Sequence, residues 1–227
     1  MNRSFSLPFL IMGVVFCVCL ICSNLLEVKM ISLGGITATA GLIVFPISYI
    51  INDCIAEVWG YRKARLIIWL GFLMNLMTVI FIQIAIILPS ATFWDGQKSF
   101  ETVFSSTPRI LLASFIAFLV GSFLNAYVMS KMKISSKGKH FSLRAITSTV
   151  VGESADSLLF FPIAFGGVVP VNELLILIVT QACLKTAYEI VILPVTIRVV
   201  RFVKKIDGSD VYDQKVSYNI FKIKELQ

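Results

Sequence analysis

The sequence predicts an all-α, polytopic integral membrane protein with six transmembrane helices and both termini in the cytosol. First, the 227 residues are 57% hydrophobic and only 15% charged, with a mean hydropathy of +0.88, unlike a soluble domain. Second, long apolar runs recur along the chain at lengths that match a bilayer. Third, Lys and Arg gather in alternate connecting segments.

Six apolar runs predict the spans. Leu7 to Leu26 carries no formal charge, and twenty helical residues cover about 30 Å, the thickness of the hydrocarbon core. We interpret this run as a retained helix because no convincing signal-peptide cleavage site follows it. Loops rich in Gly, Pro, Ser and charge separate five further runs. These extend over about Thr37–Val58, Leu66–Leu88, Ile110–Lys131, Arg144–Phe165 and Glu173–Arg201.

The basic residues set the orientation. With the N-terminus inside, thirteen Lys and Arg lie in or beside cytosolic segments and three lie on the other face, which is the positive-inside asymmetry. The net charge of +7 is therefore topological, and we do not expect nucleic-acid binding. Three spans start inside and three outside, so a 3+3 inverted arrangement is possible, although the halves show no convincing sequence match.

The last segment differs in composition from the spans. From Asp207 onward the chain is polar and mixed in charge, with no apolar run. We therefore expect residues 1–206 to form the six-helix transmembrane domain and residues 207–227 to form a cytosolic polar tail.

Reactive residue types argue against most enzyme classes. The five cysteines lie in apolar runs without ligand spacing and are typical of small hydrophobes. The single histidine, His140, lies in a basic loop, and neither H-E-x-x-H nor G-x-S-x-G occurs. We expect no catalytic residue, no metal site and no cofactor. A lipid-processing enzyme that holds a divalent ion between paired acids is a less favoured alternative.

Charged residues inside the predicted spans are the main functional signal. They are Asp53, Glu57, Glu153, Asp156, Lys185 and Glu189. An ionised Asp or Lys facing lipid at a helix centre opposes insertion by about 2.5–3.5 kcal/mol, so these groups must face protein or water. Helical rise places five of them, Glu57 excepted, roughly 10 to 20 Å from the cytosolic helix ends. The surplus of acids over one lysine predicts a cationic or hydrogen-bond-donating guest, such as a proton, a sodium ion or an amine-bearing solute.

Helical periodicity collects further polar residues on the same faces. The three stripes comprise Tyr49, Asn52, Asp53, Ala56 and Glu57; Thr149, Glu153, Asp156, Ser157 and Phe160; and Gln181, Lys185, Tyr188 and Glu189. Asn24, Asn75, Gln83, Ser114, Ser122 and Asn125 lie in the other spans, where such groups often join helices. We expect the stripes to face one another across a central cavity.

Several roles stay open for these groups. Lys185 and Glu189 are four residues apart and can pair directly on one helix. Gly152 and Pro162 can bend the fifth span at its carboxylates, as in discontinuous transporter helices, or Pro162 can merely kink its outer end.

Asp53 and Glu57 also have a structural alternative. They lie near the cytosolic end of the second span, beside Arg62 and Arg65. Ion pairs with these arginines could brace the helix end instead of binding a solute.

The run DCIAEVWGYRKAR at residues 53–65, which follows Phe45-Pro46, resembles the signature of the queuosine precursor transporter family, also described as a vitamin uptake transporter family. The resemblance covers roughly residues 10–200. It includes six spans, Asn24, Gly152-Glu153-x-x-Asp156-Ser157 and Gln181-x-x-x-Lys185-x-x-x-Glu189. Members often have Thr and Tyr where this chain has Ala56 and Trp59, and the tail after Lys205 lies outside the resemblance.

The resemblance implies a multi-pass secondary transporter of the bacterial inner membrane. It would import 7-deazaguanine precursors of the tRNA nucleoside queuosine, such as 7-cyano-7-deazaguanine, 7-aminomethyl-7-deazaguanine or queuine, for tRNA modification. A carboxylate can accept hydrogen bonds from the ring N–H and exocyclic amine of such a base, and an aromatic ring can stack on it.

The predicted roles follow from that chemistry. We assign Glu153 and Asp156 to base recognition. Gating, coupling to protons or sodium, or recognition is assigned to Asp53, Glu57, Lys185 and Glu189, and the remaining lining residues are Asn24, Gln181 and Tyr49. The alternative is the substrate-binding membrane subunit of an ATPase-driven vitamin importer, because such subunits are also small six-helix proteins. The chain has no Walker motif, so the energy must come from elsewhere in either case.

Overall fold

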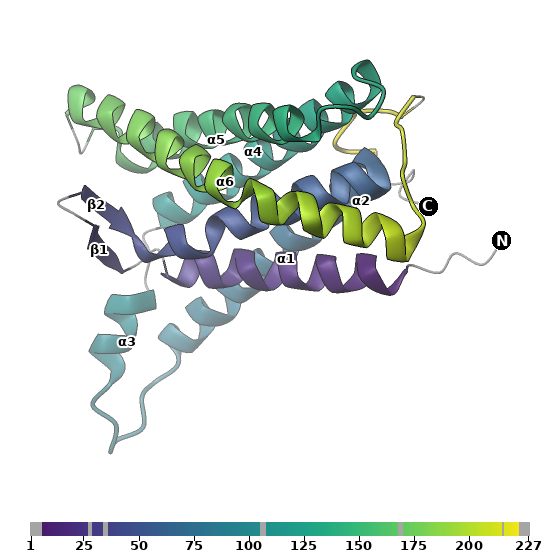
Figure 1. Cartoon of the computed structure of the whole chain (residues 1–227). Helices are drawn as coiled ribbons and strands as arrows, with labels where there is room; N and C mark the ends of the chain where they lie inside the picture. The colour runs from purple at the N-terminus through teal and green to yellow at the C-terminus, as the bar shows by residue number, and fades with distance from the viewer. Residues whose placement is uncertain are drawn as a thin grey trace.

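The protein is a bundle of long helices (Figure 1). The computed structural model describes residues 6–26, 29–33, 36–104, 108–167, 170–214 and 216–222. Its helices are α1 (Leu7–Leu26), α2 (Phe45–Ile87), α3 (Gln97–Phe104), α4 (Pro108–Ser135), α5 (Phe141–Phe165) and α6 (Val171–Asp207). Helix α1 begins and α6 ends at one end of the bundle, which we call the terminal end (Figure 1).

The helices confirm an all-α membrane protein. Within the described residues, four segments are long and apolar enough to cross a bilayer: Leu7–Leu26, Ala40–Ile87, Leu112–Ser135 and Leu174–Asp207. Large apolar side chains such as Leu10, Phe81 and Val191 are exposed on the bundle's exterior, as a lipid-facing surface requires. Helix α5 has 25 residues, enough to span, although its polar stripe lowers its hydropathy. The count of six spans and the cytosolic placement of both termini stay predictions.

Helix α2 consists of two limbs joined at Gly60. The φ of 81° and ψ of 175° at Gly60 interrupt the helix, in a region that essentially only glycine adopts. The first limb ends where Trp59 packs on Phe9, near the start of α1, with ring centroids 5.3 Å apart. The second limb then follows α1 in the same direction, with Gly71 against Phe16. The chain therefore reverses at Gly60, between the second and third predicted spans.

The start of α2 corrects one prediction. A span from about Thr37 was expected, but β1 (Met30–Leu33) and β2 (Ile36–Thr39) form an antiparallel hairpin. A 3₁₀-helix over Ala40–Ile43 follows before α2 begins. The β-branched residues of β2 favour a strand, and Pro46 suits the first turn of α2. A small two-stranded sheet is thus added to the helical fold.

Helix α5 is continuous, so it does not break at its carboxylates. It stays helical from Phe141 to Phe165 although Pro162 lies inside it. A Cβ at Gly152 would lie 2.9 Å from both the Asn125 Cβ and the Gly121 carbonyl oxygen. Gly152 therefore serves the close packing of α5 on α4 rather than a bend.

The segment after α6 folds back against the terminal end. The Asp213 carboxylate accepts the backbone N–H of Tyr61 at 2.8 Å, so it caps the second limb of α2 from a distant part of the chain. The guanidinium of Arg65 donates to the carbonyls of Ser217 and Asn219 at 3.1 and 2.6 Å. The Gly60 junction is therefore held by the tail.

Candidate functional site

The buried charges form two groups. The central cluster contains Asp53, Glu153, Asp156, Lys185 and Glu189, from α2, α5 and α6. The terminal cluster lies nearer the terminal end and contains Glu57, Lys133, Arg144, Lys204 and Asp210. The central cluster contains the acids that the sequence analysis expected to meet inside the bundle from three separate helices.

Lys185 joins α6 to α5 within the central cluster. Its Nζ lies 2.9 Å from Glu153 Oε2 and 3.0 Å from Asp156 Oδ2. The side chains are 12%, 1% and 10% exposed, respectively, so both ion pairs are shielded from water. The alternative of a direct pair between Lys185 and Glu189 is wrong here, because the two α5 carboxylates, one helical turn apart, converge on the same ammonium group.

Asp53 and Glu189 provide the unpaired charge of the central cluster. These residues are 0% and 2% exposed, and none of their four carboxylate oxygens accepts a hydrogen bond. The two carboxylates are close enough to repel each other. A buried ionised group without a partner is costly, so this pair is suited to receive a proton, a cation or a donor group of a solute.

A chain of hydrogen bonds frames the central cluster. The Asn52 amide donates to the Ser122 carbonyl at 3.3 Å and to Asn125 Oδ1 at 3.2 Å. Asn125 in turn donates to Thr149 Oγ1 at 3.5 Å. These groups join α2, α4 and α5, as expected for polar residues between transmembrane helices. They hold the helices that carry Asp53 and Glu153.

Tyr49 lies between α4 and α5 beside the acids. It is 3% exposed, and its hydroxyl occupies space 2.7 Å from where a Cβ of Gly121 would be. The same Cβ would lie 3.1 Å from the Asp156 Cβ. Gly121 therefore gives the phenol room next to the α5 carboxylates.

Glu57 belongs to the terminal cluster. Its carboxylate accepts two hydrogen bonds from Arg144, one at 3.1 Å, and one from Lys204 at 2.7 Å, while Lys133 Nζ lies 3.8 Å away. Glu57 therefore connects α2 to α4, α5 and α6. The predicted alternative partner Arg65 instead binds tail carbonyls.

Asp210 completes the terminal cluster from outside the helices. It pairs with Lys133 and with Lys204, the latter at 2.9 Å. Partial burial opposes ionisation of Asp210, but hydrogen bonds from Lys133 and Lys204 hold its pKa below the ordinary value. The sequence analysis did not predict Lys133, Arg144 and Lys204 as site residues, because it used them only to set the orientation by the positive-inside rule. The signal available was their position at the cytosolic ends of predicted spans.

Two cavities among the described residues lie away from the central acids. One of about 260 Å³ is near the terminal end, lined by Glu57, Gly138, Phe141, Ser142, Ile197, Val200, Arg201 and Lys204. We call it the inner cavity. The other, the outer cavity, measures about 40 Å³ and lies between α1, the second limb of α2 and α3. None of the five residues of the central cluster lines either of these two cavities.

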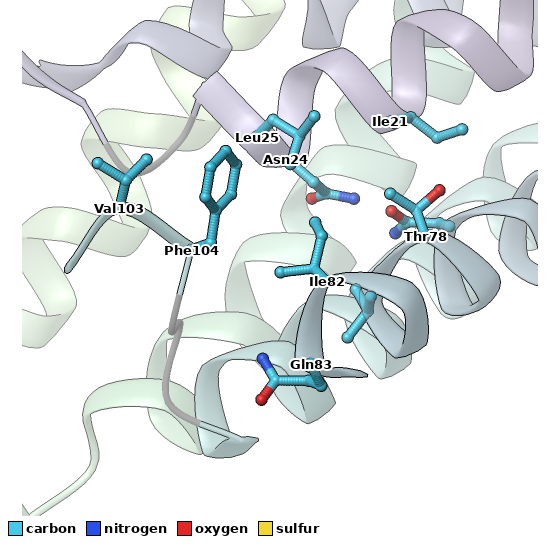
Figure 2. A pocket seen from close by; sticks show the side chains of 10 residues that line it. Ile21, Asn24, Leu25, Thr78, Ile82, Gln83, Val103 and Phe104 are labelled. Atoms are coloured by element: carbon cyan, nitrogen blue, oxygen red, sulfur yellow. The ribbon is translucent and has the colours of Figure 1, made fainter. Parts of the chain in front are cut away.

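The outer cavity contains several predicted polar residues. The predicted residues Asn24, Asn75 and Gln83 line it together with Thr78 and apolar neighbours, and Figure 2 shows Asn24 and Thr78 near each other at this cavity. Asn24 also accepts a hydrogen bond from Ser114 at 3.3 Å. The outer cavity is large enough for only a few water molecules. Asn24 is therefore separate from the central cluster. Gln181, in contrast, lies close to that cluster along the chain: it is half-buried and precedes Lys185 by about one turn of α6.

Comparison with known proteins decides the family. Residues 39–199 match the family described as "Putative vitamin uptake transporter". The chain belongs to this family. It is a multi-pass cell membrane protein, and the family name denotes transport rather than a chemical reaction. All five residues of the central cluster lie inside the matched region, whereas Lys204, Asp210 and the tail follow it.

Individual relatives agree with the family. A "Probable queuosine precursor transporter" of Bacillus subtilis (strain 168) is 32% identical over 176 residues, which cover 77% of this chain and 76% of the relative. A "Queuosine precursor transporter" of Escherichia coli (strain K12) is 29% identical over 143 residues, covering 63% of this chain and 62% of the relative. No solved structure matches the chain.

Proposed function

We propose that this protein imports queuosine precursors across the cell membrane as a secondary transporter, with the central cluster as the base-binding site. The names of the relatives support the substrate class. One structural observation supports the site: four carboxylates from three helices are buried together with a single lysine. Such an acid surplus is suited to a guest that brings hydrogen-bond donors or positive charge.

The recognition chemistry uses the two α5 carboxylates. A 7-deazaguanine base presents a ring N–H and an exocyclic amine on one edge, and one carboxylate can accept both hydrogen bonds. Glu153 and Asp156 are buried and point to the same ammonium group of Lys185, which is itself a donor. The Tyr49 ring lies beside them and offers a flat face for stacking on the base.

Access to this site requires the terminal cluster to open. The inner cavity reaches Glu57, one helical turn from Asp53 on the same limb of α2. The ion pairs of Glu57 with Arg144 and Lys204 close the route from that cavity to the central cluster. We assign Glu57 to this inner gate, and Asp53 with Glu189 to binding the coupling proton or sodium ion.

Uptake by the purified protein in liposomes tests the proposal. A radiolabelled 7-deazaguanine base should accumulate when a proton or sodium gradient is imposed, and accumulation should stop when an ionophore dissipates it. Glu153→Gln and Asp156→Asn should reduce uptake to the level of empty liposomes without lowering protein content. Glu101→Gln on α3 is the matched carboxylate-to-amide control and should transport normally.

Two results would count against parts of the proposal. Undiminished uptake by either variant would remove that carboxylate from the recognition site. Binding of the base without uptake by this polypeptide alone would instead favour the substrate-binding subunit of an ATPase-driven importer.

A further inference from the structure

The central cluster contains one cation, and it contacts the two acids assigned to the base. Lys185 lies 2.9 Å from Glu153 and 3.0 Å from Asp156. The other two acids, Asp53 and Glu189, are fully buried and accept no hydrogen bond. The arrangement therefore keeps one pair of carboxylates covered by a tethered ammonium group and leaves the second pair uncovered.

We propose that Lys185 is a tethered counter-ion that covers Glu153 and Asp156 in the empty site and moves toward Glu189 and Asp53 when a base binds. This inference rests on the proposed function, and it adds a specificity-determining role for Lys185. The donor edge of the base replaces the ammonium group on the α5 carboxylates.

The positions of the charged groups make this movement short. Glu189 follows Lys185 by four residues on α6, which is about 6 Å of helical rise, within the length of a lysine side chain. Asp53 faces the same space from α2 and Glu153 and Asp156 from α5, and Tyr49 lies beside them. Glu153 and Asp156, which Lys185 leaves, gain hydrogen-bond donors from the base. Glu189 and Asp53, which Lys185 approaches, accept no hydrogen bond before it moves.

The charge of the base then decides how much Lys185 contributes. A neutral 7-deazaguanine supplies hydrogen-bond donors but no positive charge. The ammonium group of Lys185 is then still needed to balance the charge of Asp53 and Glu189. A 7-deazaguanine with an aminomethyl group carries its own ammonium, which competes with that of Lys185 for Asp53 and Glu189. Lys185 therefore favours neutral bases over cationic ones.

Binding measurements on the full-length Lys185→Met protein in detergent test this role. Isothermal titration should show that the ratio of the affinity for the aminomethylated base to that for the 7-cyano base rises at least about tenfold over the native ratio. Without Lys185, only the aminomethylated base supplies an ammonium group to Asp53 and Glu189, so a charge-assisted contact is lost only in the complex with the neutral base. Lys185→Arg keeps the charge and should retain the native ratio.

Chemical rescue supplies a readout that a purely structural lysine would not give. Lys185→Ala leaves space for a short alkylamine. Propylammonium chloride at millimolar concentration should restore binding of the neutral base to this variant, whereas propanol should not. The same salt should weaken binding of the aminomethylated base, because both cations compete for Asp53 and Glu189, which the donor edge of the base leaves uncovered.

The outcomes separate this inference from the proposed function. If the native protein binds neither base, the proposed function fails. If it binds both and Lys185→Met weakens both equally, Lys185 has no role in selectivity. Should Lys185→Met not accumulate, Lys185→Met combined with Glu189→Gln removes one acid with the lysine and carries the same measurement. Failure of both variants to accumulate, with normal Lys185→Arg protein, would make Lys185 a structural counter-ion and overturn the inference.

Discussion

The terminal and central clusters use similar residues one helical turn apart on α2, yet they differ in charge balance. In the terminal cluster, Glu57 and Asp210 face Arg144, Lys133 and Lys204, so cations outnumber acids and each acid has a partner. In the central cluster, four acids share Lys185, and Asp53 and Glu189 accept no hydrogen bond. Paired buried charges hold helices together, whereas unpaired ones require a guest or a proton.

Replacing Glu57, the carboxylate shared by three cations of the terminal cluster, should cause the largest loss of stability. Glu57→Gln leaves Arg144 and Lys133, which are 1% and 2% exposed, without their shared carboxylate. Stranding one partner of a buried pair costs about 3–5 kcal/mol of stability. Denaturant unfolding of the protein in detergent micelles measures this loss. A loss below about 1 kcal/mol would show that the cluster does not hold the helices.

The same chemical change in the central cluster should act on transport instead. Asp53→Asn removes a buried carboxylate that accepts no hydrogen bond, so stability should be unchanged or higher. Uptake driven by the ion gradient should fall at least about tenfold, equivalent to about 1.4 kcal/mol of transition-state free energy. Glu57→Gln, one turn away, is the matched comparison. A destabilised Asp53→Asn protein would contradict the contrast between the clusters.

The junction between the two limbs of α2 predicts a smaller loss. At Gly60 a Cβ would lie 2.7 Å from Asp213 Oδ1, and the backbone conformation disfavours other residues. Gly60→Ala should cost about 1–3 kcal/mol, measured by the same unfolding experiment. Gly208→Ala also has a positive φ, of 68°, but an open Cβ position, so it should cost less. Equal losses would exclude a role for contact with Asp213.

The outer member of the terminal cluster should have the smallest effect. The Asp210 side chain is 44% exposed, so Asp210→Asn should cost at most about 1 kcal/mol. Because the pKa of Asp210 is lowered by Lys133 and Lys204 against the effect of partial burial, its contribution is present above its unfolded pKa, about 3.9. It is lost as pH falls through the lower folded pKa. Unfolding curves at pH 3 and pH 6 should show the difference between the native protein and the variant shrinking at the lower pH.

Much of the fold followed from local sequence, but the pairings did not. Apolar length predicted α1, and helical periodicity put Asp53, Glu153 and Lys185 on inward faces, because both depend only on nearby residues. Arg144 meets Glu57 across 87 positions of sequence, and helix rotation and tilt set that contact. Periodicity alone cannot choose between such partners.

Two local features were also beyond the sequence signals. Residues 36–39, Ile-Thr-Ala-Thr, carry no charge and precede an apolar run, so they were assigned to the start of a span. Short uncharged segments of this kind do not distinguish a strand from a helix. The tail is attached partly through backbone carbonyls, such as those of Ser217 and Asn219, and partly through the carboxylates of Asp210 and Asp213. Every residue has such a carbonyl, and the partners of Asp210 and Asp213 lie far away in the sequence, so no local pattern predicted the docking site.

The cap at the Gly60 junction also constrains how the chain matures. Asp213 follows Tyr61 by 152 residues, so the ribosome synthesises all the later helices before the residue that satisfies this amide exists. Until then the loop between the two limbs has no partner from the tail. The final conformation of the Gly60 junction is therefore set only after the later helices have been synthesised, and truncations before Asp213 should yield chains that insert normally yet stay susceptible to added proteases at this junction.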